Sequence, residues 1–195
     1  MEFINSIKPY WNNEPFNFNT NIFSASLQTC LKIPILAYEN GLEVRYRNNS
    51  LKNLDSLPLC KDTPSEKMVN DCFFQILNID LISKEIKNFK QKLQDYFQSN
   101  ITANFYLNNF DIKGLPRHYD DHHVLIFQIF GKKKWWLHKN NLKDSPPYWK
   151  DHPNPPNRLL DSKLTYQNTG LYIPRHYWHR AEPQSGISAH ISFGI

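Results

Sequence analysis

A histidine and a carboxylate stand two positions apart at His118 and Asp120, shortly before an apolar run that begins at Val124. In an extended segment, residues i and i+2 point to the same side, so this imidazole and carboxylate can reach one point. His179, which follows a second apolar run and Pro174, is the best candidate for a third group. Two histidines and one carboxylate on one face of a metal ion leave its other positions open, an arrangement that suits non-haem Fe(II) and O₂ chemistry.

Such a centre is commonly combined with a dicarboxylate co-substrate, 2-oxoglutarate, which chelates the iron at one end and needs a cation at the other. Lys133 is predicted to lie one short β-hairpin away from the metal motif and to face the same barrel. Tyr106 would add a hydroxyl and Asn104 an amide, because both share one face of a preceding strand. Two interpretations of His190 stay open: a residue beside the co-substrate, or a hydrogen-bonded histidine of the core.

Short strands dominate the second half of the chain and predict the scaffold of this site. Apolar and β-branched runs separated by turn residues indicate a mainly β fold with flanking helices, a double-stranded β-helix of the cupin or jelly-roll type. A turn at Gly131-Lys132 predicts a hairpin between the second and third strands. Residues 140–157 hold five prolines and predict a surface excursion near the mouth of the site, whose role stays open. The predicted strands cover residues 102–107, 124–130, 133–137, 171–174 and 187–193.

The first hundred residues are predicted to flank this barrel. Apolar residues recur at helical steps from Ile82 to Phe97, with charged residues between them, so an amphipathic helix capped by Asp80 or Ser83 is expected there. A shorter helix over 23–31 should end before Pro34. A strand is predicted over 42–47, a strand or another kind of buried segment over 72–77, and a loop over 48–66. One domain over 1–195 is expected, with 1–100 flanking the barrel and 101–195 carrying the core strands and the metal site.

Composition limits the remaining possibilities. A chain of 195 residues is long enough to bury a core without disulfides, and its three cysteines form no C-x-x-C pair. With no apolar run of membrane-spanning length and no signal peptide, we expect a cytoplasmic protein without a membrane partner. The net charge of +5 permits an acidic partner, but nucleic acid is not indicated. Of Lys132, Lys133 and Lys134, at least two are expected in solvent at the hairpin tip.

Four segments of the second half resemble the Jumonji-C (JmjC) cupins of the ribosomal oxygenase type, in the same order and over roughly residues 100–195. The resemblance implies a double-stranded β-helix, with iron held by His118, Asp120 and His179. It also implies 2-oxoglutarate held by Lys133, Asn104 and Tyr106. The four segments are Asn104-Phe-Tyr106, Gly114-Leu-Pro-Arg-His-Tyr-Asp-Asp121, Phe127-Gln-Ile-Phe-Gly-Lys-Lys-Lys-Trp135 and Tyr172-Ile-Pro-Arg-His-Tyr-Trp-His-Arg-Ala-Glu182.

The resemblance implies an oxygenase that uses Fe(II), 2-oxoglutarate and O₂ to hydroxylate a side-chain carbon of a protein or peptide, with succinate and CO₂ as co-products. Lysine demethylation and metal or ligand binding without turnover are the alternatives. The chain has His176 where the family usually has glycine and Arg117 where it often has proline. It also stops after the last predicted strand, so we expect the family's chemistry here and leave the substrate and a homodimer open.

Three polar neighbours of the first two ligands have more than one interpretation. Asp121 is either a partner of a ligand or a carboxylate in a solvated turn. His122 and His123 are expected to be structural or exposed, because His118 and Asp120 form the better pair for a metal.

Overall fold

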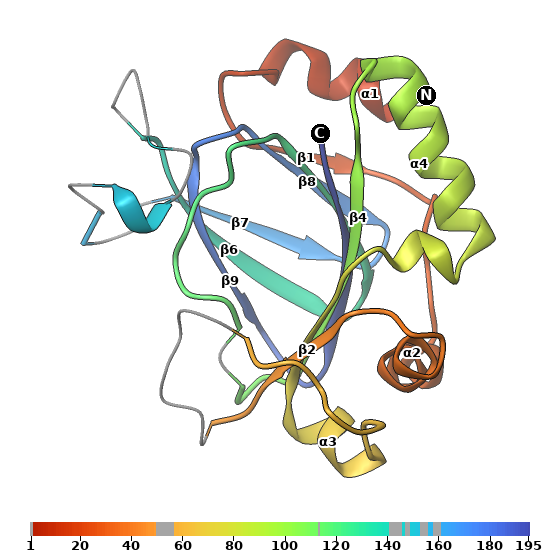
Figure 1. Ribbon diagram of the computed structural model, residues 1–195. Coiled ribbons are helices and arrows are strands. Elements are labelled where there is room, and N and C mark those ends of the chain that lie inside the picture. Colours follow the sequence, from red (N-terminus) through yellow and green to blue (C-terminus); the bar gives the residue numbers. More distant parts are fainter. Residues whose placement is uncertain are drawn as a thin grey trace.

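The computed structural model describes residues 2–49, 57–112, 114–140, 146, 149–152, 156–157 and 161–195. In this part of the chain two β-sheets face each other across a lumen, and helices lie along the outer side of the larger sheet (Figure 1). The predicted mainly β architecture with flanking helices is confirmed. No described helix is long and apolar enough to cross a membrane.

The larger sheet has seven strands in the order β1-β8-β5-β10-β4-β3-β2, and the smaller has three in the order β7-β6-β9. Every neighbouring pair is antiparallel. Because β1, β2 and β3 precede residue 100, one sheet joins both halves of the chain. The bounds are β1 Phe16–Asn19, β2 Val44–Arg47, β3 Phe73–Ile76, β4 Thr102–Asn108, β5 Val124–Phe130, β6 Lys132–His138, β7 Asp161–Tyr166, β8 Thr169–Ile173, β9 Trp178–Pro183 and β10 Ser188–Gly194.

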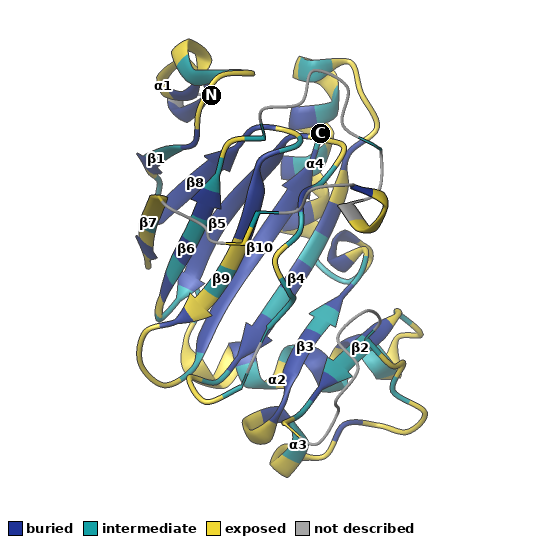
Figure 2. Cartoon of the chain, turned by 90° about the vertical axis from the view of Figure 1, so that its left-hand side faces the viewer, coloured by how far each residue is buried: buried dark blue, intermediate teal, exposed yellow. Residues whose placement is uncertain are grey.

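Strand β5 is buried on both of its faces, as Figure 2 shows for the centre of the large sheet. On the outer face, Phe127 packs edge-on against Phe89 of a helix, with ring centroids 5.3 Å apart. On the inner face, Ile126 joins Trp135 of the opposite sheet in a second apolar cluster. The main core therefore lies between the large sheet and the helices, and a smaller one lies between the two sheets.

The predicted hairpin between β5 and β6 is wrong. Strand β5 pairs with β8 and β10, whereas β6 pairs with β7 and β9, so the chain crosses from one sheet to the other at Gly131. Gly131 has φ of +68°, and a Cβ atom there would lie 2.3 Å from the carbonyl oxygen of Ile187. Only glycine fits this corner. Lys133 therefore reaches the lumen from the small sheet, two residues after the corner.

Three of the strands were not predicted from the sequence. His179 was expected to follow a strand, but it lies within β9 (Trp178–Pro183), at the edge of the small sheet. Strands β1 and β7 were also missed. All three are short, and β7 and β9 carry charged residues, so their local patterns hardly differ from those of loops.

The predicted amphipathic helix is confirmed as α4 (Lys84–Phe97). Its inward residues Ile86, Phe89 and Leu93 are buried. The Ser83 hydroxyl accepts a hydrogen bond from the backbone N–H of Ile86, so Ser83 is the cap. The other helical segments are α1 Glu2–Ile7, α2 Leu27–Glu39, α3 Glu66–Asp71 and the short 3₁₀ turns η1 Lys8–Tyr10, η2 Ile79–Leu81 and η3 Trp149–Asp151.

The helix predicted over 23–31 is misplaced. Helix α2 begins after Ser26, whose hydroxyl accepts from the backbone N–H of Thr29, and it continues through Pro34 to Glu39. Cys30, Pro34 and Ala37 form one buried face at helical spacing. Burial of that face outweighs the backbone hydrogen bond that proline removes. The predicted loop over 48–66 lies partly outside the described residues.

Candidate metal and co-substrate site

His118 and His179 are joined through their backbones. The N–H of His118 donates to the carbonyl of His179 at 3.0 Å, and the N–H of His179 donates to the carbonyl of His118 at 2.7 Å. This isolated antiparallel bridge fastens the segment before β5 to the edge of β9. Asp120 follows two residues later, so backbone pairing alone brings all three predicted ligands to one place.

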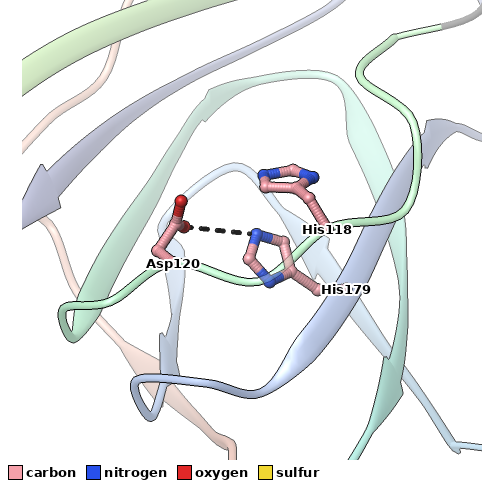
Figure 3. Close-up of side chains that lie close together, drawn as sticks. All are labelled: His118, Asp120 and His179. Atoms are coloured by element: carbon pink, nitrogen blue, oxygen red, sulfur yellow. Dashed lines mark ion pairs between the residues drawn. The ribbon is translucent and has the colours of Figure 1, made fainter. Parts of the chain in front are cut away.

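The three side chains converge (Figure 3). His118, Asp120 and His179 each offer one ligand atom, and these atoms lie within 4.8 Å of one another. Nε2 of His179 lies 3.5 Å from Oδ2 of Asp120. Mutual distances of this size leave room for an ion bound by all three groups at ordinary ligand distances.

Backbone carbonyls orient both imidazoles. Nδ1 of His118 lies 2.8 Å from the carbonyl oxygen of Pro116, and Nδ1 of His179 lies 2.9 Å from that of Tyr177. A carbonyl can only accept, so each Nδ1 carries the hydrogen and each Nε2 carries the lone pair of the neutral ring. The tautomer that a metal needs is therefore set by the backbone.

Protonation states also suit a metal. Burial and the neighbouring His118 lower the pKa of His179 to about 4. Burial alone would raise the pKa of Asp120. The neighbouring His118 and His179 lower it by more than burial raises it, so the pKa of Asp120 lies below its ordinary value. At neutral pH the site therefore holds a neutral His179 and an ionised Asp120, the forms that bind a cation without first losing a proton.

Lys133 lies in the same lumen with its side chain 1% exposed. Its ammonium nitrogen lies 2.9 Å from Nδ1 of His190 on β10, and no carboxylate in the described part of the chain pairs with it. Burial lowers the pKa of Lys133 to about 7. A buried cation without a counter-charge is unfavourable, so this position suits an anionic ligand.

Asn104 and Tyr106 line the lumen from β4, next to β10 in the large sheet. The Tyr106 ring stacks on His190, with centroids 4.7 Å apart and planes 5° apart. The Tyr106 hydroxyl accepts from Gln75, and Oδ1 of Asn104 accepts from the backbone N–H of Asn78. The Tyr106 hydroxyl also interacts with the side chains of Asn104 and Ser192, so these polar groups form one connected network on the cavity wall.

All seven predicted site residues line one cavity of about 430 Å³. Residues of both sheets form its walls, and it is large enough for a metal and a small dicarboxylate. The members are Asn104, Tyr106, His118, Asp120, Lys133, His179 and His190.

Comparison with known proteins decides the family. A family model described as the JmjC domain matches residues 80–195. The chain belongs to the JmjC domain family. The match begins just before α4 and includes β4 to β10, with every predicted ligand.

Individual relatives agree with this assignment. Ribosomal oxygenase 2 of Rattus norvegicus is 32% identical over 111 residues, which cover 57% of this chain and 24% of that protein. The bifunctional lysine-specific demethylase and histidyl-hydroxylase NO66 of Dictyostelium discoideum is 30% identical over 139 residues, covering 62% and 24%. This chain therefore matches about a quarter of the length of these relatives.

A solved structure of the ribosomal oxygenase YcfD of Escherichia coli covers 100% of this chain and 51% of its own, with a TM-score of 0.67 at 12% identity. At that identity the likeness concerns the fold. The predicted double-stranded β-helix of the cupin type is confirmed.

The polar neighbours of the ligands have distinct roles in this JmjC domain. Asp121 does not face the metal cluster, because its carboxylate lies 2.5 Å from Nε2 of His176. His123 is buried, and its Nδ1 accepts from the Tyr172 hydroxyl at 3.0 Å, so it is structural. His122 is exposed and lines the cavity rim.

Sequence analysis missed cavity residues that lie outside the JmjC match. Gln75 of β3 supports the Tyr106 hydroxyl, and Arg45 of β2 lines the same cavity. The signal for Gln75 was a single amide within the apolar run Cys72-Phe-Phe-Gln-Ile-Leu77. Of the proline-rich segment 140–157, Lys150 lines the cavity, and several other residues lie outside the described part.

Proposed function

We propose that this JmjC domain is an Fe(II)- and 2-oxoglutarate-dependent oxygenase that hydroxylates a side-chain carbon of a protein or peptide. The observation that carries the proposal is one lumen that holds both an oriented His-Asp-His cluster and a buried lysine with which no described carboxylate pairs. His118, Asp120 and His179 would hold the metal, and Lys133 would hold the far carboxylate of the co-substrate.

Iron bound here with 2-oxoglutarate and O₂ would supply the oxidation of a C–H bond, with release of succinate and CO₂. The chain's own residues would orient the metal ligands and bind the co-substrate. The carbonyls of Pro116 and Tyr177 keep each imidazole in the metal-binding tautomer. Tyr106 and Asn104 would donate hydrogen bonds to the carboxylate that Lys133 neutralises. Trp135 and Ile126 pack in the cluster between the sheets and give the cavity part of its apolar wall.

Two comparisons support this proposal. The YcfD oxygenase, which shares the fold with a TM-score of 0.63, has been solved in complex with cobalt and 2-oxoglutarate. The relatives with similar sequences are called ribosomal oxygenase and histidyl-hydroxylase, which supports a protein or peptide as substrate here. Lysine demethylation stays a prediction for which the described residues offer no specific support.

Turnover of the co-substrate tests the proposal. The purified protein with Fe(II) and ascorbate should convert 2-oxoglutarate to succinate, measured by NMR. Lys133→Ala should raise the 2-oxoglutarate concentration needed for half-maximal turnover by about a hundredfold, because a charge-assisted contact to a buried carboxylate is lost. Lys134→Ala is the matched control, since Lys134 stacks on Trp136 at 3.9 Å, and it does not line the cavity.

Iron binding without any succinate formation would instead favour a metal-binding cupin without turnover. For the substrate, we expect a mass gain of one oxygen on a protein or peptide of cells that carry the gene, absent in cells that lack it. Mass spectrometry of both cell types measures this difference.

A further inference from the structure

A second pocket of about 380 Å³ adjoins the metal cavity. The two share Gly114, Leu115, Pro116 and Ala181 as walls. Pro116 lies two residues before His118, and Ala181 lies two residues after His179. Asp120 lies two residues after His118, in the opposite direction along the chain from Pro116. A chain that enters the metal cavity with one residue can therefore extend into the second pocket with its neighbours.

The second pocket contains a buried guanidinium. Arg47 of β2 is 7% exposed, and its Nη1 donates to the carbonyl of Gly114 at 2.8 Å. No carboxylate in the described segments forms an ion pair with Arg47. Burial lowers the pKa of this guanidinium, but arginine stays charged at any physiological pH. A buried cation with one carbonyl partner has unfilled donors and an unfavourable desolvation free energy, which an anionic ligand would offset.

Four other charged residues line the pocket and determine its net charge. Arg117 and Arg180 also line it, and so do the carboxylates of Asp111 and Glu182. Glu182 is already engaged, because it pairs with Arg180 at 2.9 Å and accepts from the indole N–H of Trp136. Among the described residues that line the pocket, this leaves the positive charges of Arg47 and Arg117 and the negative charge of Asp111, so the net charge is positive.

Apolar surface at the same place suits a peptide more than a small ion. Phe110 lines the second pocket and is 52% exposed, so its ring can contact a peptide bound there. Arg45 lines the metal cavity two residues before Arg47 on the same strand, so β2 presents one arginine to each cavity. Strand β2 lies outside residues 80–195, the part matched by the JmjC model.

We propose that this second pocket binds a carboxylate of the peptide substrate, so that the enzyme selects peptides with an acidic group near the modified residue. The inference rests on the proposed function, because it assumes that a peptide occupies the metal cavity. The Arg47 guanidinium would bind the carboxylate through two parallel N–H groups, with Arg117 as a second, exposed contact.

Selection from a peptide library tests this inference. The protein is first loaded with Mn(II) and N-oxalylglycine, an analogue of 2-oxoglutarate that does not react, so that the first cavity is filled. Random short peptides with acetylated and amidated ends are then passed over it, and the retained ones are sequenced by mass spectrometry. We expect Asp and Glu to be enriched about tenfold, the effect of one charge-assisted hydrogen bond. A parallel library with free C-terminal acids shows whether a terminal carboxylate binds instead of a side chain.

Four variants test whether Arg47 and Arg117 cause the enrichment of acidic peptides. Arg47→Met should abolish the enrichment, Arg47→Lys should retain part of it, and Arg117→Gln should reduce it without disturbing the core. Lys92→Gln removes one positive charge from the exposed face of α4, so it should keep the full enrichment. Enrichment of basic residues, no charge preference, or unchanged enrichment in Arg47→Met would overturn the inference. Failure of the wild-type protein to bind Mn(II) and N-oxalylglycine would instead count against the proposed function.

Discussion

The ammonium nitrogen of Lys133 lies 2.9 Å from Nδ1 of His190, and these two buried side chains join the small sheet to the large one across the lumen. Burial and the nearby Lys133 lower the pKa of His190 well below its ordinary value. His190 therefore stays neutral and accepts a hydrogen bond from Lys133. Whether the pair carries a positive charge then depends on the proton of Lys133 alone.

This pair predicts a pH dependence for co-substrate binding. Because the pKa of Lys133 in the empty cavity is about 7, the lysine is charged below that pH and increasingly neutral above it. A bound carboxylate favours the charged form and raises this pKa, so above pH 7 binding requires uptake of a proton. We expect the Kd of N-oxalylglycine, with Mn(II) bound, to be constant below pH 7 and to rise by up to about tenfold per pH unit above it. Calorimetry in buffers of different ionisation enthalpy measures both the Kd and the number of protons taken up on binding.

Lys133→Arg is the control for this titration, since a guanidinium remains charged over the whole range. Its Kd should not change with pH in this window. A wild-type Kd that does not change between pH 6 and pH 9 would contradict a titrating Lys133.

His179→Ala should strongly weaken metal binding while the fold persists. One of three side-chain ligands is lost, so Mn(II) affinity should fall by about two orders of magnitude or more. The bridge to His118 uses backbone atoms only, so it does not need the imidazole. Calorimetric titration with Mn(II) measures the affinity, and circular dichroism checks the fold.

His122→Ala is the comparison for that variant. His122 lines the same cavity but is exposed and does not belong to the three-residue cluster. Its loss should leave Mn(II) affinity unchanged within a factor of about two. Equal affinity of the two variants would show that His179 is not a ligand.

His123 predicts a loss of stability in acid. Its Nδ1 accepts from the Tyr172 hydroxyl and from the backbone N–H of Arg175, and burial, with the nearby Arg175, lowers its pKa to about 4. Between pH 6.5 and 4 the unfolded chain binds a proton here that the folded chain does not, so stability falls as pH falls through this window. Solvent screening reduces the effect, so the loss of stability due to His123 across this window should be about 2 kcal/mol.

His123→Asn keeps an acceptor near the position of Nδ1 but does not titrate. The free energy of unfolding in urea should therefore fall less steeply between pH 6.5 and 4 in this variant than in the wild-type protein. Parallel pH profiles for the two proteins would rule out His123 as the source.

His176 has a left-handed backbone conformation, with φ of +62°. The ribosomal-oxygenase type of JmjC protein, which the sequence resembles, usually has glycine at this place. Glycine adopts this conformation without strain, whereas a Cβ atom adds about 1 kcal/mol. His176→Gly should therefore be more stable than His176→Ala by about that amount in urea unfolding. Both variants lose the contact to Asp121 equally, so the difference between them reports the backbone. A more stable alanine variant would contradict the strained position.

Local patterns in the chain were enough for several features. The spacing of apolar residues from Ile82 to Phe97 specified α4, because a helix that buries one face requires that period. The alternation Asn104-Phe-Tyr106 placed the amide and the hydroxyl on one face of β4, and the separation of His118 and Asp120 placed both on one side of an extended segment.

Long-range packing determined the rest. Nothing in the residues around Gly131 separates a hairpin from a corner between sheets, because strand periodicity reports which side is buried and not which strand is the neighbour. The backbone bridge from His118 to His179 and the approach of Arg47 to Gly114 each join segments more than sixty residues apart. Such contacts depend on the path of the whole chain. Residue types and short spacings therefore identified the chemistry, while only the folded sheets decided which groups meet and which pocket lies beside them.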